Sequence, residues 1–477
     1  MRGNDQVVTR GRQTRREALR LLAAGAMGGF CHAAARSAAP NIIFILTDDL
    51  GWTELGCFGN RFNHTPHLDR LAQDGVRFSS AYAAAPVCSP TRASIMTGLY
   101  PVRVGITDYL RGDDPRYLSP DRRTLPKLLR EAGYRTGLIG KWHLMGDYAQ
   151  RRGDPTLHGF DEVICSETRY IGAGNYFYPY AFMPQVQARQ EGEYLTDRLN
   201  QEAVDFIARN AQRRFFLFLS HYAPHTRLAG KPDKVARYAR QLGAGKNRNN
   251  PELAAMLESI DEGVGMIRSK LQELGIARQT MLAFMSDNGG ETNVTSNAPL
   301  RGGKSQLYEG GIRVPFIVSW PGNDRPGSEC QAPVNSTDLY PTLLQVAGAA
   351  IPAGLDGQSM VGSIGHPSSE RERTMFWYYP LDKPHFLGGR SSAAVRRGDF
   401  KLIQFLDTGQ AELYDLREDP GESKDLSPSN TAKTGELQKA LRDWTSRKSA
   451  IGSDRGKNGS QMNADTRRSG RPPAHPD

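Results

Sequence analysis

Three apolar segments of seven residues, each followed by polar side chains, constrain the fold of this chain more than any other feature. They occupy residues 41–47, 214–220 and 280–286. Their leucine, β-branched and aromatic content predicts short strands that are buried on both faces. Helical patterns lie around them at residues 66–74, 124–132, 194–210, 251–274 and 337–347. Because strands and helices alternate, we expect an α/β fold with a large, mixed, mostly parallel sheet flanked by helices.

Polar side chains follow each apolar segment at the point where its strand should end. They are Asp48 and Asp49 after the first, His221 and His225 after the second, and Asp287 and Asn288 after the third. Ligands of open parallel sheets bind at the carboxyl ends of the strands. We therefore expect these side chains to meet in one site.

The sequence changes character after about residue 370. Short segments at residues 375–379, 392–396, 401–405 and 412–415 are separated by turn signals and followed by a helical pattern at 434–446. This pattern predicts a smaller antiparallel sheet with a closing helix. We therefore divide the chain into a main domain at 40–370, a C-terminal antiparallel subdomain at 371–448, and flanking segments at 1–39 and 449–477.

The net charge of +10 does not indicate a nucleic-acid partner, because it lies at the two ends of the chain. Residues 1–40 hold seven arginines against two acidic residues, and residues 433–477 hold ten basic against five acidic residues. The body between them is neutral, whereas a groove that binds phosphates needs positive charge on the folded body. The polar, glycine- and proline-rich segment 449–477 is predicted to be a disordered basic tail.

The first 39 residues have the features of an export signal. Arg15 and Arg16 precede a short, weakly apolar run at residues 21–30, and small residues that suit a cleavage site follow at 33–39. The run is too short to span a bilayer as a stable anchor. The pattern resembles a twin-arginine signal peptide, which implies the twin-arginine export machinery as a partner and a periplasmic or secreted location.

Five widely spaced cysteines show neither a disulfide framework nor zinc-binding spacing. One of them, Cys88, opens a predicted helix with the segment Cys88-Ser89-Pro90-Thr91-Arg92. A helix N-terminus is expected to lower the pKa of this thiol and to favour anions beside it. Arg92 follows one turn later on the same face. By itself, the segment fits either a reactive thiol or a buried cysteine before a proline turn.

The segment also resembles the C-x-P-x-R signature of the type I sulfatases of the alkaline phosphatase superfamily, which Cys88, Pro90 and Arg92 match. Further motifs occur in the order typical of this family and span nearly the whole body. They are Thr47-Asp48-Asp49, Gly140-Lys141-Trp142-His143-Leu144, Ala223-Pro224-His225, Ser286-Asp287-Asn288-Gly289 and Gly302-Gly303-Lys304. Such agreement is far more specific than the pentapeptide alone.

The resemblance to these formylglycine-dependent sulfatases implies that a formylglycine-generating enzyme oxidises Cys88 to Cα-formylglycine. The hydrated aldehyde is then a gem-diol, one oxygen of which attacks the sulfur of a sulfate ester. Because a thiol cannot complete this cycle, the unmodified protein should be nearly inactive. The resemblance gives Arg92 the role of orienting and stabilising the hydrated aldehyde.

The same resemblance implies a metal ion beside residue 88. Asp48, Asp49, Asp287 and Asn288, with the modified residue 88, form an oxygen-only ligand set that suits Ca²⁺, with Mg²⁺ as the other candidate. The cation would activate the diol and neutralise charge on the sulfuryl oxygens. Each pair of ligands, taken alone, also fits an ordinary turn at the end of a strand.

Four further residues receive roles from the resemblance. Lys141 contacts the oxygens of the metal site or of the diol, and His143 is the base that removes the remaining hydroxyl proton. His225 and Lys304 hold the sulfate and help to protonate the leaving oxygen. Since Lys141 and His143 are two residues apart, an extended segment would turn both side chains toward the site.

The sequence predicts the substrate less closely. His385 and Arg390 lie in a segment that resembles the C-terminal region that reaches the pocket in sulfatases of sulfated sugars. Aromatic stacking and a cation there would bind a sugar with acidic groups, and ordinary packing of the subdomain explains the segment equally well. Arg227 stands where the family commonly has proline after His-Thr, which changes a wall of the pocket. We expect a sulfated carbohydrate of the galactose type; the sulfate position, exo or endo action and oligomeric state are left open.

Two other functions fit the same motifs. A phosphonate monoester or phosphodiester hydrolase of the superfamily can share the formylglycine signature, but these relatives usually have histidine at the position of Asn288. An amide oxygen suits Ca²⁺, whereas imidazole favours a softer transition metal. The second alternative is a non-catalytic protein that binds sulfated glycans, and it requires residue 88 to remain cysteine.

Overall fold

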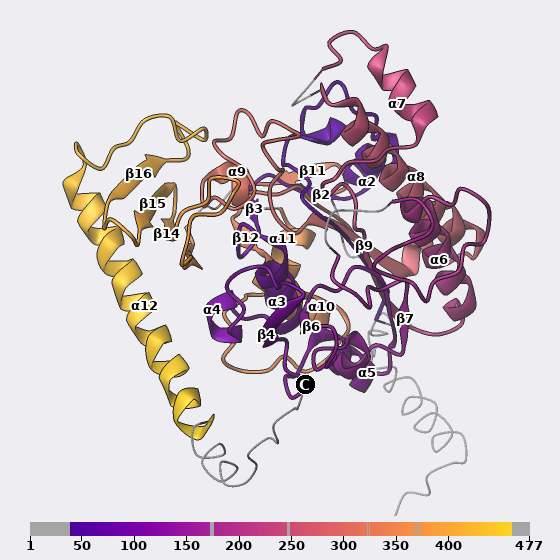
Figure 1. Cartoon of the computed structure of the whole chain (residues 1–477), viewed down its shortest axis with the longest axis horizontal. Coiled ribbons are helices and arrows are strands. Elements are labelled where there is room, and N and C mark those ends of the chain that lie inside the picture. Colours follow the sequence, from indigo (N-terminus) through magenta and orange to yellow (C-terminus); the bar gives the residue numbers. More distant parts are fainter. Residues whose placement is uncertain are drawn as a thin grey trace, which may run out of the picture. The chain divides into compact units, whose positions relative to one another are not determined.

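The computed structural model describes residues 39–459 except 172–175, 246–248, 322, 324, 368–369 and 371, and only the backbone of 448–459. The predicted export signal at 1–39, apart from its last residue, lies outside the described residues. The part of the predicted tail after residue 459 also lies outside them. Figure 1 shows how the helices and strands are arranged.

An eight-stranded sheet forms the core of the main domain. Its order is β11 (Ser328–Cys330), β2 (Val76–Phe78), β10 (Phe316–Ser319), β9 (Thr280–Ser286), β1 (Asn41–Thr47), β8 (Phe215–Ser220), β5 (Arg135–Gly140) and β7 (Glu162–Ile164). Strand β10 runs antiparallel to both neighbours, and the other pairs in this sheet are parallel. The three apolar segments are the adjacent central strands β9, β1 and β8, and the prediction of a mostly parallel sheet is confirmed.

Helices cover both faces of this sheet because β1 contributes apolar side chains to each face. Ile42, Phe44 and Leu46 enter one core, while Ile43 and Ile45 enter the other, as the alternation of side chains along a strand requires. The first core is closed by α3 (Cys88–Thr97), α5 (Leu125–Glu131) and α10 (Leu339–Val346), and the second by α2 (Pro66–Asp74), α6 (Leu195–Asn210) and α8 (Pro251–Glu273). Figure 1 shows α6 and α8 on one side of the fold and α3, α5 and α10 on another.

The five helices predicted in the main domain are all present, with ends shifted by at most two residues. Proline occupies the first turn of α2, α5 and α8, where its missing N–H would have had no helical partner. Asn335 caps the 3₁₀ turn Ser336–Asp338 that leads into α10, and its side chain accepts from the N–H of Thr337. Local signals in the sequence therefore mark where these helices begin.

The C-terminal subdomain is a four-stranded antiparallel sheet, as predicted. Its strands β13 (Thr374–Tyr379), β14 (Ser392–Arg397), β15 (Phe400–Phe405) and β16 (Ala411–Asp415) follow chain order. Leu437 and Leu441 of helix α12 (Thr431–Gly459) pack on this sheet. The helix continues past residue 449, where the tail was expected to begin, because each added residue gains a backbone hydrogen bond once a helix has formed. Among the helices of the described residues, none has the length and apolar content needed to cross a membrane.

Smaller elements complete the described part of the chain. They are β3 (Ala81–Tyr82), α4 (Pro101–Val104), β4 (Asp113–Tyr117), β6 (Met145–Asp147), α7 (Pro232–Ala239), α9 (Glu309–Ile312), β12 (Val334–Asn335) and α11 (Val361–Gly365), with 3₁₀ turns at Gly56–Phe58, Pro155–His158 and Ala277–Gln279.

A buried ionic network joins the C-terminal sheet to the main domain. Lys401 on β15 is fully buried, and its Nζ lies 2.9 Å from both Glu309 Oε1 and Glu422 Oε1. Glu309, on α9, accepts a hydrogen bond from the Tyr82 hydroxyl at 2.7 Å. Burial, with the charge of Glu309, raises the pKa of Glu422 to about 7 despite the attraction of Lys401. Without the Lys401 ammonium, two carboxylates would share a site that excludes water.

The variant Lys401→Met should therefore lower the free energy of unfolding by about 3 kcal/mol, because removing one partner leaves buried charges without compensation. Urea unfolding at pH 8 measures this loss, and the loss should be smaller at pH 6, where a carboxyl of the pair takes up a proton. The control is Lys439→Met, which breaks the exposed Lys439–Asp443 pair. This variant should leave the urea concentration at the midpoint of unfolding unchanged. Equal midpoints for both variants would contradict a stabilising role of the network.

Candidate active site

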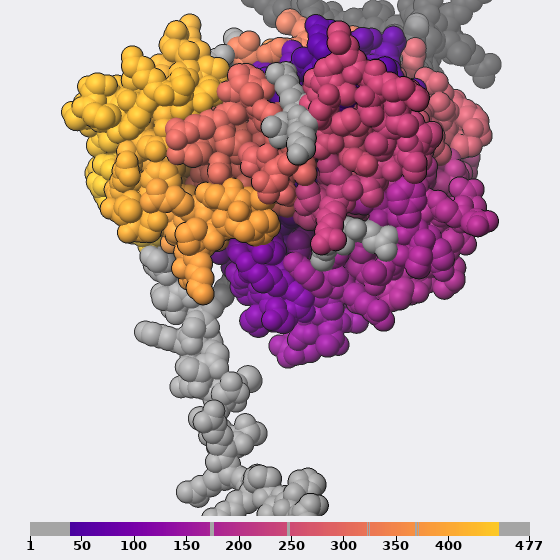
Figure 2. All heavy atoms as spheres, turned by 45° about the horizontal axis from the view of Figure 1, so that its top comes forward, coloured from indigo at the N-terminus to yellow at the C-terminus, as the bar shows by residue number. Residues whose placement is uncertain are grey.

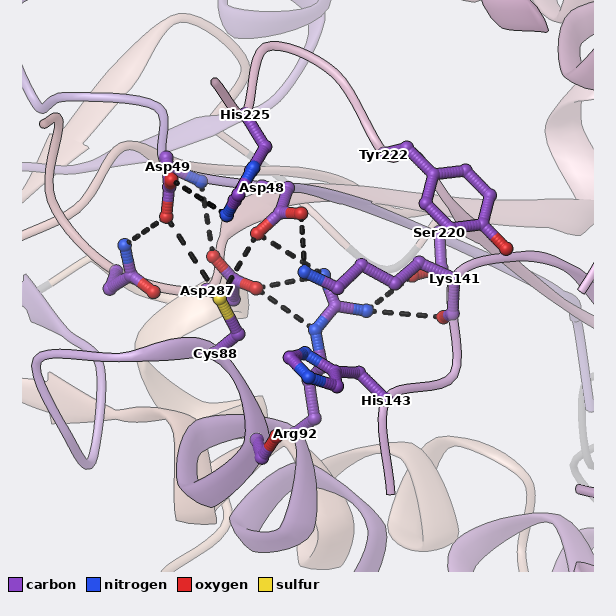
Figure 3. Close-up of polar contacts among 12 residues, drawn as sticks. Asp48, Asp49, Cys88, Arg92, Lys141, His143, Ser220, Tyr222, His225 and Asp287 are labelled. Carbon is purple, nitrogen blue, oxygen red and sulfur yellow. Dashed lines mark hydrogen bonds and ion pairs between the residues drawn. The ribbon is translucent and has the colours of Figure 1, made fainter. Parts of the chain in front are cut away.

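The ends of β1 and β9 form a buried acidic site (Figure 3). Asp48 and Asp49 follow β1, Asp287 and Asn288 follow β9, and none of the four is more than 3% exposed. The two strands are paired in parallel along their full length, so their ends lie at the same edge of the sheet. The shared site that the sequence predicts at the carboxyl ends of these strands is therefore present.

Asp49 has a left-handed backbone conformation, with φ of 66°. Its N–H donates to Asp287 Oδ1 at 3.2 Å, and the N–H of Leu50 donates to Ser286 Oγ at 2.9 Å. Both acceptors belong to the end of β9. The neighbouring strand thus holds a conformation that costs free energy outside glycine and turns the Asp49 carboxylate into the site.

Cys88 is the first residue of α3 and points at these carboxylates (Figure 3). Its Sγ lies 3.3 Å from Asp48 Oδ1 and 4.0 Å from Asp49 Oδ1. Burial and the charge of Asp48 raise the pKa of the thiol well above its usual value, although Lys141 and Lys304 oppose them. The expectation that the helix N-terminus lowers this pKa is therefore wrong, because burial beside carboxylates outweighs the helix dipole. The unmodified side chain is a protonated thiol.

Three cations compensate the buried carboxylates. Lys141 Nζ donates to Asp48 Oδ2, Lys304 Nζ to Asp49 Oδ2 at 2.6 Å, and Arg92 Nε to Asp287 Oδ2 at 2.9 Å. Burial raises the pKa of Asp48, but the surrounding cations, with Lys141 the strongest, hold this pKa well below its usual value. Burial and the charge of Asp48 raise the pKa of Asp287 to about 7. The site therefore balances the negative charge of its buried carboxylates with positive charge from three side chains.

Arg92 connects several elements around the site, although its Nη2 makes an ion pair without a hydrogen bond to any described residue. Its Nη2 lies 2.8 Å from Asp287 Oδ2, and its Nη1 donates to Ser220 Oγ at 2.7 Å and to the Lys141 carbonyl at 3.1 Å. It therefore links α3 to the ends of β5, β8 and β9. Ser220, the last residue of β8, is a member of the site that the motifs did not single out. The role of Arg92 toward a hydrated aldehyde stays a prediction.

The oxygen atoms of the site fit a divalent cation. Ligand atoms of Asp48, Asp49, Cys88 and His225 lie within 4.8 Å of one another. Asn288 donates through Nδ2 to Asp49 Oδ1 at 2.7 Å, and its own Oδ1 is buried without a hydrogen-bond partner among the described residues. A buried acceptor without a donor costs free energy that a bound cation would remove. Because carboxylate and amide oxygens are the ligands of Ca²⁺ and Mg²⁺, we favour Asn288 over the His225 imidazole as a ligand.

His143 reaches the site through a different backbone conformation from the expected one. Its φ is 55°, so the segment that it shares with Lys141 is not extended. Its Nε2 lies 2.9 Å from the Leu110 carbonyl, which can only accept, so Nε2 carries the proton. Its Nδ1 is buried and has no hydrogen-bond partner in the described part of the chain. Burial, with the charges of Lys141 and Arg92, lowers the pKa of the ring well below its usual value. The ring is therefore neutral, with Nδ1 free to accept a proton.

Glu167 is a buried carboxylate that the sequence motifs missed. Its Oε1 accepts from the N–H of His143 at 2.5 Å, and its Oε2 accepts from the N–H of Trp142 at 3.0 Å and from the Tyr222 hydroxyl at 2.8 Å. It thus fixes the left-handed turn at His143 and ties it to the loop that leads to His225. The contacts are made by backbone groups and by a residue distant in sequence, so no local pattern identifies Glu167.

A cavity of about 220 Å³ opens onto Cys88. Of the residues singled out from the sequence, it brings together Cys88, Lys141, His143, His225, Lys304 and His385. Its other lining residues are Tyr109, Tyr170, Ile171, Thr226, Arg227 and Phe386. Arg390 does not line it: its guanidinium lies 3.0 Å from Asp407 Oδ1 and 4.2 Å from the centre of the Phe405 ring. Six of the predicted site residues therefore line one cavity, the predicted metal ligands Asp48, Asp49, Asp287 and Asn288 are not among its lining residues, and Arg390 lies outside it.

Comparison with known proteins shows similarity along both domains. A family model described as Sulfatase matches residues 40–349, and one described as N-sulphoglucosamine sulphohydrolase, C-terminal, matches residues 303–449. The steryl-sulfatase of Rattus norvegicus is 33% identical over 440 residues, which cover 73% of this chain and 74% of that protein. The N-acetylgalactosamine-6-sulfatase of Canis lupus familiaris is 33% identical over 479 residues, which cover 88% of this chain and 87% of that protein. The crystal structure of Ps i-CgsB in complex with k-i-k-neocarrahexaose is similar with a TM-score of 0.74 and 32% identity, over 85% of this chain and 92% of that chain.

Calcium should stabilise the protein if the oxygen cluster binds it. At concentrations about a hundredfold above the dissociation constant, a bound ion raises the free energy of unfolding by about 2.7 kcal/mol. Thermal unfolding of EDTA-treated protein, titrated with CaCl₂, measures this as a rise in Tm. Asn288→Leu removes the unpartnered amide oxygen and should raise the calcium concentration needed to increase Tm. Asn293 is an exposed residue of the same loop, and Asn293→Ala should leave this calcium concentration unchanged. A titration that is the same in both variants would rule out Asn288 as a ligand.

Proposed function

The chain belongs to the sulfatase family and is a sulfuric ester hydrolase, and on this premise we propose that it releases sulfate from a sulfated carbohydrate by using a Cα-formylglycine at position 88 and a Ca²⁺ ion. One observation carries the proposal: Cys88 lies beside Asp48 and Asp49, whose carboxylates are paired with Lys141 and Lys304 in the same buried site. The hydrated formylglycine would supply a nucleophilic oxygen, and the cation would supply the charge that activates it.

Asp48, Asp49, Asp287 and Asn288 are the residues that would hold the cation, with Mg²⁺ as the other candidate. Their oxygens fit a hard divalent ion. The Oδ1 of Asn288 is buried and has no hydrogen-bond partner among the described residues, so it is available as a ligand. A protonated thiol is a poor ligand for such an ion, whereas an oxygen at the position of Cys88 Sγ would complete the set. The donor set of this chain therefore supports an oxygen-bearing residue 88.

Lys141 and Lys304 would bind the sulfate. Both ammonium groups line the cavity beside Cys88, and the pKa of each is raised by the carboxylate that it contacts, despite burial. They keep their positive charge over the whole working pH range and would stabilise the negative charge on the sulfuryl oxygens. Each can also move toward the substrate when a cation takes over its carboxylate partner.

Two histidines lie where protons must move. His143 Nδ1, neutral and without a partner among the described residues, would accept a proton on the residue-88 side of the cavity. His225 Nε2 lies 3.6 Å from Asp49 Oδ2, beside Lys304. His225 and Lys304 would hold the sulfate and help to protonate the leaving oxygen. Because the His225 Nδ1 faces the Thr226 carbonyl, its Nε2 can deliver a proton only from the imidazolium form, which burial opposes by lowering the pKa of the ring and Asp49 favours. The two histidines thus serve opposite proton transfers.

Two observations favour a sulfated sugar as the substrate. Among the relatives, one is named for N-acetylgalactosamine 6-sulfate hydrolysis, and one similar structure holds a neocarrahexaose. In this chain, Tyr109, Tyr170 and Phe386 line the cavity, and aromatic rings provide flat apolar surfaces for a sugar ring. We therefore propose a carbohydrate sulfate of the galactose type.

We also propose that the twin-arginine machinery exports the protein to the periplasm or beyond. Arg15 and Arg16 with the short apolar run support the proposal, and the Sulfatase match begins at residue 40, directly after the signal. Since this route carries folded proteins, oxidation of Cys88 and folding would precede export.

Production with a formylglycine-generating enzyme should convert Cys88 to formylglycine and yield Ca²⁺-dependent sulfate release from an aryl sulfate. Mass spectrometry of the peptide with residue 88 and a sulfate assay measure the two outcomes. Cys88→Ala should lower kcat at least about a thousandfold, since it removes the nucleophile. Cys330→Ala, on the edge strand β11, should keep both modification and activity.

The same experiment separates the alternatives. A modified residue 88 with phosphonate or phosphodiester turnover and no sulfate release would favour the phosphonate monoester hydrolase function. Cysteine that persists in the native host, without any hydrolysis, would favour a non-catalytic protein that binds sulfated glycans.

Replacing Arg15 and Arg16 together by lysine should keep the full-length precursor in the cytoplasm, because twin-arginine export requires the arginine pair. Cell fractionation followed by immunoblotting measures the distribution. Replacing Arg10 and Arg12 by lysine is the matched control and should leave export unchanged. Export of the unfolded chain by the Sec pathway would contradict the proposal.

A further inference from the structure

We infer that the mouth of the cavity is a second subsite, in which Arg227 binds an acidic group on the sugar unit next to the sulfated one. The inference rests on the proposed function and specifies the chemistry of its substrate: a sulfated carbohydrate with a second negative charge, carried by a carboxylate or by another sulfate.

Arg227 is a positively charged residue of the cavity whose side chain has no partner among the described residues. It is exposed, lines the cavity with Cys88 and Lys304, and makes no hydrogen bond or ion pair with any described residue. Lys141 and Lys304 are each paired with a carboxylate of the acidic site. A guanidinium without a partner beside a binding cavity is suited to bind a carboxylate or sulfate through two parallel hydrogen bonds.

Two other arginines near the cavity are already paired, and the histidine at its mouth is uncharged. Arg111 lies 3.4 Å from Asp108 Oδ2 and covers the Tyr109 ring at 4.3 Å. Arg390, which the sequence suggested for this role, pairs with Asp407 outside the cavity. His385 lines the cavity, but burial lowers its pKa, so it is uncharged at neutral pH. Among the residues that line the cavity, Arg227 is therefore the permanent cation left unpaired, and it can supply the second positive charge for an acidic sugar.

Aromatic side chains form the rest of the mouth. Phe386 is 78% exposed and stacks on His385 at 4.4 Å between ring centres, and Tyr170 is 40% exposed. Tyr109 meets His385 edge to face at 5.7 Å. Large apolar rings exposed at the rim of a binding cavity indicate a surface that a ligand covers. A sugar ring on this wall could place an acidic substituent against Arg227.

The mouth is built from segments that are far apart in the sequence. Tyr109 and Tyr170 come from the first half of the chain, Arg227 from the loop after β8, and Phe386 from the connection between β13 and β14. On the face shown in Figure 2, the orange C-terminal region lies directly against the indigo and purple N-terminal region. Residues outside the acidic site thus select the substrate, while the acidic site carries the chemistry.

Three disaccharides with the same sulfated unit test the inference. They differ only in the adjoining unit, which is neutral, carries a carboxylate or carries a second sulfate. With the formylglycine form of the protein, kcat/KM should be about tenfold higher for one or both acidic disaccharides than for the neutral one. Charge-assisted hydrogen bonds contribute enough binding free energy for a difference of this size. The pair of acidic substrates shows which anion the subsite prefers.

Variants of Arg227 assign this preference to the guanidinium. Arg227→Gln keeps a polar chain without the charge and should reduce the ratio of acidic to neutral kcat/KM to about one. Arg227→Lys should retain part of the ratio, because it keeps the charge but loses the two-pronged geometry. Arg278→Ala, before the start of β9 and a strand's length from the site, is the control and should keep the full ratio.

Equal kcat/KM for neutral and acidic disaccharides in the unchanged protein would overturn the inference, as would a full preference in Arg227→Gln. Both results would leave the proposed function standing, because sulfate would still be released. No sulfate release from any disaccharide or aryl sulfate would instead overturn the proposed function, and this inference with it.

Discussion

Three carboxylates brought together at the ends of β1 and β9 need positive charge beside them, and the surrounding elements supply it. An isolated buried carboxylate costs several kcal/mol. Arg92 from α3 and two lysines from separate loops make the compensating contacts, and each contact pins one element to the edge of the sheet. The same charges are the ones that we propose hold a cation and an anionic ester.

A second layer of contacts holds His143, for which we propose a role in proton transfer. Glu167 accepts hydrogen bonds from the backbone on one side and from Tyr222 on the other, and so fixes the conformation that points His143 into the cavity. Lys401 of the C-terminal sheet is paired with Glu309 of α9, which is close in the chain to Lys304. The C-terminal subdomain is therefore tied to the main domain near the site, and it also lines the cavity with His385 and Phe386.

Much of the fold could be predicted because its signals are local. The apolar strands, the helices with proline in their first turns, and the change to short antiparallel strands all appear at the predicted residues. The site residues came from motif positions of a known family, and the placement of two acidic pairs at strand ends followed from the direction of parallel strands. Five strands of the main sheet, β11, β2, β10, β5 and β7, were not predicted, and the last helix extends into the segment predicted to be the tail.

The sequence by itself therefore determined the elements, their order and the chemical groups available, since these depend on periodicity, start signals and residue type. The tertiary structure decided how those groups behave. Burial beside Asp48 raises the pKa of Cys88 where the helix N-terminus alone would lower it, and a distant carboxylate holds His143 in a left-handed turn. Arg390 lies outside the cavity, paired with Asp407, whereas Arg227, which has no partner among the described residues, lines the cavity. Such properties arise from non-local contacts and from the exclusion of water, which no stretch of sequence contains.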